Sequence, residues 1–220
     1  MKKYILDNDD QSIPIGKLVC LARTYRKHAE EMNSPVTEDP LLFLKPSSAV
    51  IFDGDSIVIP HMSKCLHHEV ELGVVISKKC KNIIKESALD YVLGYLVALD
   101  ITARDIQLEA KKNGWSWSIA KGFDTFAPIS NVVKKEKIDN PNNLDITLTI
   151  NGKIVQKSNT KFMIYTVERI IEFISSVMTL EKGDLIMTGT PEGVGEIKEG
   201  DILEAKLGKY CSLKANVIKN

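Results

Sequence analysis

The stretch His67-His68-Glu69-Val70-Glu71-Leu72-Gly73-Val74-Val75-Ile76 leads two acidic residues directly into an apolar run. A run of this composition predicts a β-strand, in which residues two apart lie on the same face. Glu69 and Glu71 are therefore expected to point the same way, beside His67. Two carboxylates so close together repel each other unless a cation or protons compensate their charge. A solvent-facing polar strip is the alternative interpretation of this stretch on its own.

A second strand is predicted for residues 91–99, which are almost continuously apolar, as in a strand buried on both faces. It ends at Asp100, and an unpaired carboxylate at the end of a buried strand is costly. Asp100, Glu69 and Glu71 form an oxygen donor set that contains no cysteine and requires no imidazole. Such a set favours Mg²⁺ or Mn²⁺ over zinc, with water and substrate completing an octahedron. The two neighbouring histidines are alternative ligands, although we expect them to face the core or to lie behind the ligands.

The remaining pattern is rich in strands, has a few helices and lacks the regular β–α alternation of a doubly wound fold. It predicts the α+β class and one catalytic domain over residues 1–220, because no linker, repeat or change of composition divides the chain. Asn151-Gly152 predicts a hairpin turn between two strands. Apolar residues at helical spacing predict an amphipathic helix over residues 167–178, and Thr102 is expected to cap a second helix that runs to about Lys112. Further short strands are expected at residues 18–21, 41–44, 56–59, 184–187, 202–207 and 211–217.

The composition argues against several classes of protein. The chain has 220 residues, with 29 basic and 29 acidic side chains and a formal net charge of zero. Nucleic acid is not an expected partner, because binding it requires a clustered basic excess. No apolar run approaches the roughly 20 residues that cross a bilayer, and the first residues lead into an acidic run at residues 7–10 in place of an apolar signal core. Four cysteines match no zinc-binding spacing and are expected to be reduced and structural. We therefore expect a soluble, cytoplasmic protein without a membrane partner.

Two further candidates are weaker on their own. His28 and Glu31 lie one helical turn apart in a polar, helix-friendly segment. A carboxylate that accepts one imidazole proton fixes the tautomer and leaves the other nitrogen free as a base, although such pairs are more often surface pairs. Lys121 lies between aromatic and apolar neighbours, where a lysine can stabilise a developing enolate or carboxylate. A surface lysine in a loop is the equal alternative for this residue.

The segment Thr188-Gly189-Thr190-Pro191-Glu192-Gly193-Val194-Gly195 follows a predicted strand, and its glycines permit close backbone approach to a ligand. It is not a P-loop, because no Lys-Ser/Thr pair follows the glycines. It also lacks the strand-turn-helix context of a dinucleotide site. A turn without a ligand is the alternative.

Four segments occur together and in order: residues 69–75 (EVELGVV), 99–105 (LDITARD), 120–124 (AKGFD) and 188–195 (TGTPEGVG). In this combination the chain resembles the fumarylacetoacetate hydrolase family, and within it the small single-domain acylpyruvate hydrolases and oxaloacetate decarboxylases. The resemblance extends from about Lys17 to the C-terminus. It implies a mixed β-roll fold and a homodimer with one divalent metal ion, Mg²⁺ or Mn²⁺, in each subunit.

The resemblance also assigns roles to single residues. It implies that Glu69, Glu71 and Asp100 bind the metal ion. It further implies that His28 and Glu31 form a catalytic pair and that Lys121 faces the substrate. Arg23 and Thr190 are expected to contact the oxo acid, and Arg104 and Gln107 are expected to line the same pocket. The catalytic pair is expected on a lid, about residues 24–38, that orders over bound substrate.

One segment departs from the family pattern. Residues 22–25 are Ala-Arg-Thr-Tyr, where the family usually has Gly-Arg-Asn-Tyr. Loss of the asparagine amide is expected to weaken one hydrogen bond near the substrate, and this leaves the identity of the substrate open.

The implied activity is hydrolysis of the C–C bond of a 3-acylpyruvate, such as acetylpyruvate or fumarylpyruvate, to pyruvate and a carboxylic acid. His28, supported by Glu31, would deprotonate the attacking water, and the metal ion and Lys121 would stabilise the pyruvate enolate. Decarboxylation of oxaloacetate reaches the same enolate. Dehydration of a sugar-derived 2-keto-3-deoxy acid and keto–enol isomerisation are further alternatives. A non-catalytic metal-binding module is the alternative from another class, and metal-dependent turnover of any such acid would exclude it.

Overall fold

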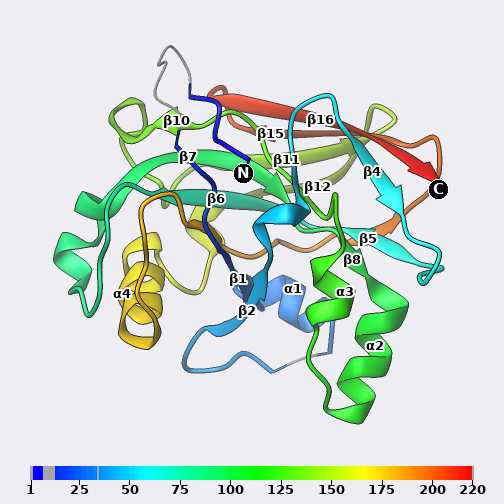
Figure 1. Ribbon diagram of the computed structural model, residues 1–220, viewed down its shortest axis with the longest axis horizontal. Coiled ribbons are helices and arrows are strands. Elements are labelled where there is room, and N and C mark those ends of the chain that lie inside the picture. Colours follow the sequence, from blue (N-terminus) through cyan, green and yellow to red (C-terminus); the bar gives the residue numbers. More distant parts are fainter. Residues whose placement is uncertain (1, 7–12, 34, 220) are drawn as a thin grey trace.

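The computed structural model describes residues 2–6, 13–33 and 35–219. The acidic run at residues 7–10 and one residue of the predicted lid, Ser34, lie outside them. The described residues form several sheets with few helices, which confirms the predicted α+β class (Figure 1). The largest sheet has six strands, in the spatial order β10 (Val133–Lys134), β7 (Val92–Leu99), β6 (Val70–Ile76), β13 (Leu185–Met187), β1 (Leu18–Ala22) and β2 (Leu41–Lys45).

The central strands β6 and β7 of the six-stranded sheet are buried on both faces, as the continuous apolar sequence of β7 predicts. In that strand Val97 and Leu99 pack into one apolar cluster, and Leu96 and Ala98 pack into a second cluster on the other face. Gly73 of β6 permits the close approach of β7, because a Cβ atom there would lie 2.4 Å from Leu96 Cδ1. The centre of the sheet is therefore a rigid layer between two apolar layers.

A second sheet contains the predicted hairpin. Asn151 and Gly152 have φ angles of 51° and 78°, which is the left-handed conformation that a two-residue hairpin turn of this sequence requires. The spatial order of its strands is β12 (Lys153–Asn159), β11 (Asp145–Ile150), β15 (Ile202–Leu207), β16 (Cys211–Lys219) and β4 (Ser56–Ile59). Two small sheets complete the arrangement, β14 (Gly195–Ile197) with β5 (Leu66–His68) and β8 (Thr102–Ala103), and β3 (Val50–Ile51) with β9 (Ala127–Pro128).

The helices lie at the margins of the sheets (Figure 1). The predicted amphipathic helix is α4 (Val167–Val177), which buries Ile170, Ile171 and Ile174. It begins where the Thr166 side chain accepts a hydrogen bond from the N–H of Arg169 at 3.3 Å, as an N-cap does. The other α-helices are α1 (Arg26–Glu31), α2 (Arg104–Asn113) and α3 (Ser118–Gly122), and short 3₁₀ turns cover Ser47–Ala49, Lys85–Tyr91, Lys135–Lys137 and Thr160–Phe162.

The prediction that Thr102 caps a helix is wrong. Thr102 lies in strand β8, the residue before α2 is Ala103, and no side chain caps this helix. The Thr102 hydroxyl instead accepts a hydrogen bond from Lys121 at 2.6 Å. A buried ammonium group requires oxygen partners, and this long-range requirement outweighs the local capping preference.

The composition led to expectations about the cysteines and about membrane-spanning helices. All four cysteines are free thiols, and Cys20 and Cys80 are buried. No helix in the part of the chain that the structure describes combines the length and apolar character needed to cross a membrane.

Candidate metal centre and active site

The three predicted metal ligands meet at the ends of β6 and β7, which are neighbouring antiparallel strands. The N–H of Asp100 donates to the carbonyl oxygen of Glu69 at 2.8 Å, so these two acids stand opposite each other. Glu71 lies two residues further along the same strand and therefore on the same face. One oxygen atom from each carboxylate lies within 4.8 Å of the others, and all three residues are buried. The pairing of β6 with β7 therefore buries three carboxylates next to one another.

Two predicted substrate residues compensate part of this negative charge. The Lys121 ammonium donates to Glu69 Oε2 at 2.9 Å and to Asp100 Oδ2 at 2.5 Å. Arg104 forms an ion pair with Glu69 Oε1 and donates to Gln107 Oε1 at 2.6 Å. With the bond to Thr102, every proton of the Lys121 ammonium has an oxygen partner. Lys121 therefore acts on its surroundings mainly through its charge.

Lys45 is a third buried cation, which our sequence interpretation missed. Its ammonium donates to the carbonyl oxygens of Ile101, Lys121 and Phe126 at 3.0, 2.7 and 2.8 Å. It also lies 2.8 Å from Asp100 Oδ1. Because three carbonyls take its three protons, its attraction to Asp100 is one of charge, and among the described residues Asp100 Oδ1 accepts no directed hydrogen bond. The available signal was a charged residue directly after the apolar run at residues 41–44, the same signal that marked Asp100.

The buried cations compensate the charge of Glu69 more fully than that of Glu71. Burial raises the pKa of Glu69, but the charges of Lys121 and Arg104 outweigh burial and hold that pKa well below its usual range. For Glu71, burial and the charges of Asp100 and Glu69 raise the pKa well above its usual value, although the N–H of Gly189 donates to it at 2.8 Å. Among the described residues, Glu71 is therefore the acid of the cluster that forms no ion pair with a cation.

A divalent cation fits this cluster. Three buried carboxylates with oxygen donors only are the set that Mg²⁺ and Mn²⁺ prefer, and the charge that Glu71 lacks is the charge that such an ion brings. Glu69, Glu71 and Asp100 are the described residues that would hold it.

The neighbouring histidines stand behind the acids. His68 is buried, and its Nδ1 lies 3.0 Å from Gln156 Oε1. His67 is half-buried, and its Nδ1 accepts a hydrogen bond from Arg104 Nε at 3.3 Å. Burial, followed by the charge of Arg104, lowers the pKa of His67 to about 4. Both rings therefore lie where we expected them, facing the core or supporting Arg104.

Gln156, on β12, is a second residue that the sequence interpretation missed. Its carbonyl oxygen accepts the N–H of Val70 at 3.0 Å, and its amide donates to Thr190 Oγ1 at 2.9 Å and to the carbonyl oxygen of Pro191 at 3.0 Å. It thereby joins the metal-site strand to the loop that carries Thr190. No sequence signal separates it from the other polar residues of β12.

The predicted catalytic pair is in contact. His28 Nδ1 lies 3.2 Å from Glu31 Oε2 on α1. The Glu31 carboxylate also accepts the backbone N–H of Gly193 at 3.1 and 3.3 Å. His28 is buried at 7% exposure. This arrangement differs from an isolated surface pair, because the glycine-rich loop fixes the carboxylate that orients the imidazole.

The base of the predicted lid is anchored at Thr24, the residue that departs from the family pattern. Its hydroxyl donates to the carbonyl oxygen of Thr188 at 2.7 Å, and its own carbonyl oxygen accepts the N–H of Ile164 at 2.7 Å. Gly189 has a φ of 91°, and a Cβ atom there would lie 2.0 Å from Thr24 Oγ1. The side chain at position 24 and the glycine backbone therefore fill one shared space.

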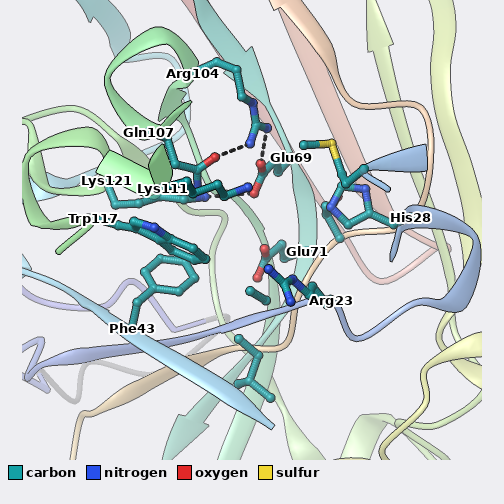
Figure 2. Close-up of a pocket in the computed structure, with 14 residues that line it drawn as sticks. Arg23, His28, Phe43, Glu69, Glu71, Arg104, Gln107, Lys111, Trp117 and Lys121 are labelled. Atoms are coloured by element: carbon teal, nitrogen blue, oxygen red, sulfur yellow. Dashed lines mark hydrogen bonds and ion pairs between the residues drawn. The ribbon is translucent and has the colours of Figure 1, made fainter. Parts of the chain in front are cut away.

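Glu69, Glu71 and His28 open onto one pocket (Figure 2). Every predicted substrate residue lines it, namely Arg23, Arg104, Gln107, Lys121 and Thr190, together with His28, Glu69 and Glu71. Glu31 and Asp100 are outside this lining and act on it through His28 and Lys121. Arg23 adopts a φ of 60°, an uncommon conformation for a residue with a side chain, at the point where β1 turns toward α1. Met32, Phe43, Lys111 and Trp117 also line the pocket, and no sequence pattern had marked them.

Comparisons with known proteins identify a family and several relatives of this chain. Residues 17–218 match the family Fumarylacetoacetate (FAA) hydrolase C-terminal. The human protein Oxaloacetate tautomerase FAHD1, mitochondrial, is 46% identical over 202 residues, which are 92% of this chain and 91% of that protein. An uncharacterized protein of Pyrococcus abyssi is 52% identical over 203 residues, 92% of this chain and 90% of that protein. The crystal structure of fumarylpyruvate hydrolase from Pseudomonas aeruginosa in complex with Mn²⁺ and pyruvate is 32% identical, with a TM-score of 0.93 over 100% of this chain and 96% of that one.

Replacement of Lys45 by methionine tests whether this lysine stabilises the buried acids. Removing one partner of a buried ion pair leaves the other charge uncompensated, so we expect Lys45→Met to lower the free energy of unfolding by about 3–5 kcal/mol. Chemical denaturation measures the change. In the double variant Lys45→Met/Asp100→Asn the loss should be smaller than the sum of the two single losses. Strict additivity would show that the two side chains do not interact.

Proposed function

The chain belongs to the fumarylacetoacetate hydrolase family, and on that premise we propose that it is a divalent-metal-dependent enzyme that hydrolyses the C–C bond of 3-acylpyruvates. The observation that carries the proposal is the juxtaposition of two groups in one pocket. A buried set of three carboxylates lies beside a histidine whose ring is oriented by a carboxylate. The first group suits a metal ion that holds a 2-oxo acid, and the second suits a general base.

Glu69, Glu71 and Asp100 would hold Mg²⁺ or Mn²⁺. The related fumarylpyruvate hydrolase of Pseudomonas aeruginosa has a structure with Mn²⁺ and pyruvate, which supports both the metal and the oxo-acid class here. A bound divalent ion would supply Lewis acidity toward the 2-oxo and carboxylate oxygens of the substrate. Arg23, Gln107 and Thr190 lie on the pocket wall, where they can orient the oxo acid.

His28 is the proposed base. With its Nδ1 proton directed at Glu31, its Nε2 is left to accept a proton from water, and the resulting hydroxide adds to the distal carbonyl carbon of the acylpyruvate. The C–C bond between that carbon and C3 then breaks. The released electron pair forms the pyruvate enolate, and His28 returns its proton to C3. The distal fragment leaves as a carboxylic acid.

Lys121 is proposed to stabilise the enolate by its charge. Its protons are directed at Glu69, Asp100 and Thr102, so it contributes a fixed positive charge at the pocket floor and needs no reorganisation during the reaction. Burial lowers the pKa of Lys121, but Asp100 and Glu69 outweigh burial and raise it above its usual value, which keeps the charge present.

Tautomerisation of oxaloacetate between its enol and keto forms is a second candidate. The observation that favours it is the identity of 45–48% to five proteins named oxaloacetate tautomerase. The reaction needs a proton acceptor near C3 and no attacking water, and His28 also suits that role. Decarboxylation of oxaloacetate would use the same enolate without a base.

Turnover of acetylpyruvate, fumarylpyruvate and oxaloacetate, each with Mg²⁺, with Mn²⁺ or with EDTA, tests the proposal. We expect hydrolysis of at least one acylpyruvate, because His28 can activate water, and loss of that activity in EDTA, because the acids hold the ion. Pyruvate release reports hydrolysis or decarboxylation, and decay of the enol absorbance of oxaloacetate reports tautomerisation. Enol decay without hydrolysis would select the second candidate. Inactivity toward all three acids would refute the proposed function and direct the search to sugar-derived keto acids.

Substitution of His28 by alanine tests the base. We expect kcat for acylpyruvate hydrolysis to fall about 10²–10⁴-fold, the usual contribution of general base catalysis, while the affinity for Mn²⁺ stays within about twofold of wild type. The matched control is Lys27→Ala, since Lys27 is a neighbour on α1 whose side chain is 77% exposed. An unchanged kcat in His28→Ala would remove His28 from the mechanism.

We also propose a homodimer. Strand β2 is an edge of the six-stranded sheet, and an exposed edge with apolar side chains favours association. Leu44 of β2 and Trp115 line the same surface groove and are 49% and 61% exposed.

Light scattering should therefore give twice the chain mass of 24.5 kDa. Leu44→Glu should give the mass of one chain, because a charge at an apolar contact opposes association. Ile84→Glu is the control, because Ile84 is equally apolar, is 62% exposed and lies outside this groove. A wild-type protein of single-chain mass would contradict the proposed dimer.

A further inference from the structure

The pocket contains more positive charge than its acids use. Four cationic side chains line it, namely Arg23, Arg104, Lys111 and Lys121. Arg104 and Lys121 are paired with Glu69, and Lys121 also with Asp100. The other two cations have no carboxylate partner among the described residues. Arg23 donates one long hydrogen bond, to the carbonyl oxygen of Pro35 at 3.4 Å.

Lys111 is directed into the pocket by the geometry of α2. It follows Arg104 and Gln107 at spacings of seven and four residues, which places all three on one face of the helix. All three line the pocket (Figure 2). The adjacent Lys112 is exposed and lies outside the pocket. The two lysines therefore differ in their surroundings although they are neighbours in sequence.

An aromatic wall holds the Lys111 side chain in place. Its ammonium lies 5.4 Å from the ring centroid of Trp117, which meets Phe43 edge to face at 5.8 Å between centroids. Burial, followed by the charges of Arg104 and Arg23, lowers the pKa of Lys111. Glu69 acts on it in the opposite direction, but Lys111 forms no ion pair among the described residues. A partly buried ammonium among other cations, with a ring face as its neighbour, is then incompletely compensated.

We propose that Lys111 is a specificity-determining residue that binds a second carboxylate of the substrate. The preferred substrates are then 2-oxo acids with two carboxylates, such as fumarylpyruvate or oxaloacetate, over singly charged ones such as acetylpyruvate. The inference rests on the proposed function, in which Glu69, Glu71 and Asp100 would hold a divalent ion that binds the first carboxylate and the 2-oxo group. Arg23 adds a second positive charge at the pocket wall.

Charge balance distinguishes the two classes of substrate. A singly charged acid would have its only carboxylate at the metal site, so Lys111 would be left without an anionic partner. A doubly charged acid supplies one carboxylate to each end of the pocket, and a charge-assisted hydrogen bond to the ammonium is among the stronger polar contacts. Loss of such a contact typically lowers kcat/KM by about 10- to 100-fold.

The test compares two acylpyruvates that differ in charge, fumarylpyruvate and acetylpyruvate, on the Mn²⁺-loaded protein. In wild type we expect kcat/KM to be higher for fumarylpyruvate. In Lys111→Met we expect the fumarylpyruvate value to fall at least tenfold more than the acetylpyruvate value, mainly through KM. Lys111→Arg should retain most of the preference, because the charge is kept, and Lys112→Met is the control. Equal losses for both substrates, or no preference in wild type, would overturn the role of Lys111.

A binding measurement separates this inference from the proposed function. If wild type turns over neither acylpyruvate, the proposed function fails, and calorimetry then compares 2-oxoglutarate with pyruvate on the same Mn²⁺-loaded protein. Tighter binding of the doubly charged acid in wild type, with the difference reduced at least tenfold in Lys111→Met, supports Lys111 as the second carboxylate site. Equal affinities in wild type, or a difference that Lys111→Met leaves intact, would refute it.

Discussion

Three carboxylates are buried at the ends of two adjacent strands, and the surrounding structure has to compensate their charge. Glu69 and Asp100 face each other across β6 and β7, and Glu71 lies beside them. Such acids cannot all remain charged away from water without cations. Lys45 and Lys121 reach them from β2 and α3, elements that are remote in sequence. Because the buried carboxylates need positive charge nearby, parts of the chain that are distant in sequence meet at these acids.

The rigid part of the molecule and the reactive part are joined at that point. The central strands of the six-stranded sheet are packed on both faces, so the acids have little freedom to move. The pocket walls come from helices α1, α2 and α3 and from two irregular segments, the turn after β1 and the loop after β13. Gln156 bonds both the start of β6 and the loop at Thr190. The loop that carries Thr190 is thereby held in a fixed position relative to the buried acids, and such fixed positioning favours catalysis.

Local patterns predicted much of the fold, and long-range contacts explain what they missed. Alternation and helical spacing identified the hairpin at Asn151-Gly152 and the helix α4, because those features depend on neighbours in sequence. Alternation also placed Glu69 and Glu71 on one face, whereas Asp100 joins them through the pairing of β6 with β7, which local patterns do not encode. Gln156 contacts Val70 across 86 positions of the chain, a separation that no local pattern encodes. Thr102 was assigned to a cap because its local preference was considered without Lys121.

The shared space between Thr24 and Gly189 limits which residues position 189 can take. Gly189 gives its N–H to Glu71, and Thr24 fixes the segment that leads to His28. A Cβ atom on Gly189 would lie 2.0 Å from Thr24 Oγ1, so Gly189 cannot take a side chain while Thr24 stays as it is. The loop that donates to Glu71 and the segment that leads to His28 are therefore coupled at this contact. A side chain at position 189 could be accepted only together with a change at position 24 and in the backbone, whose φ there is 91°.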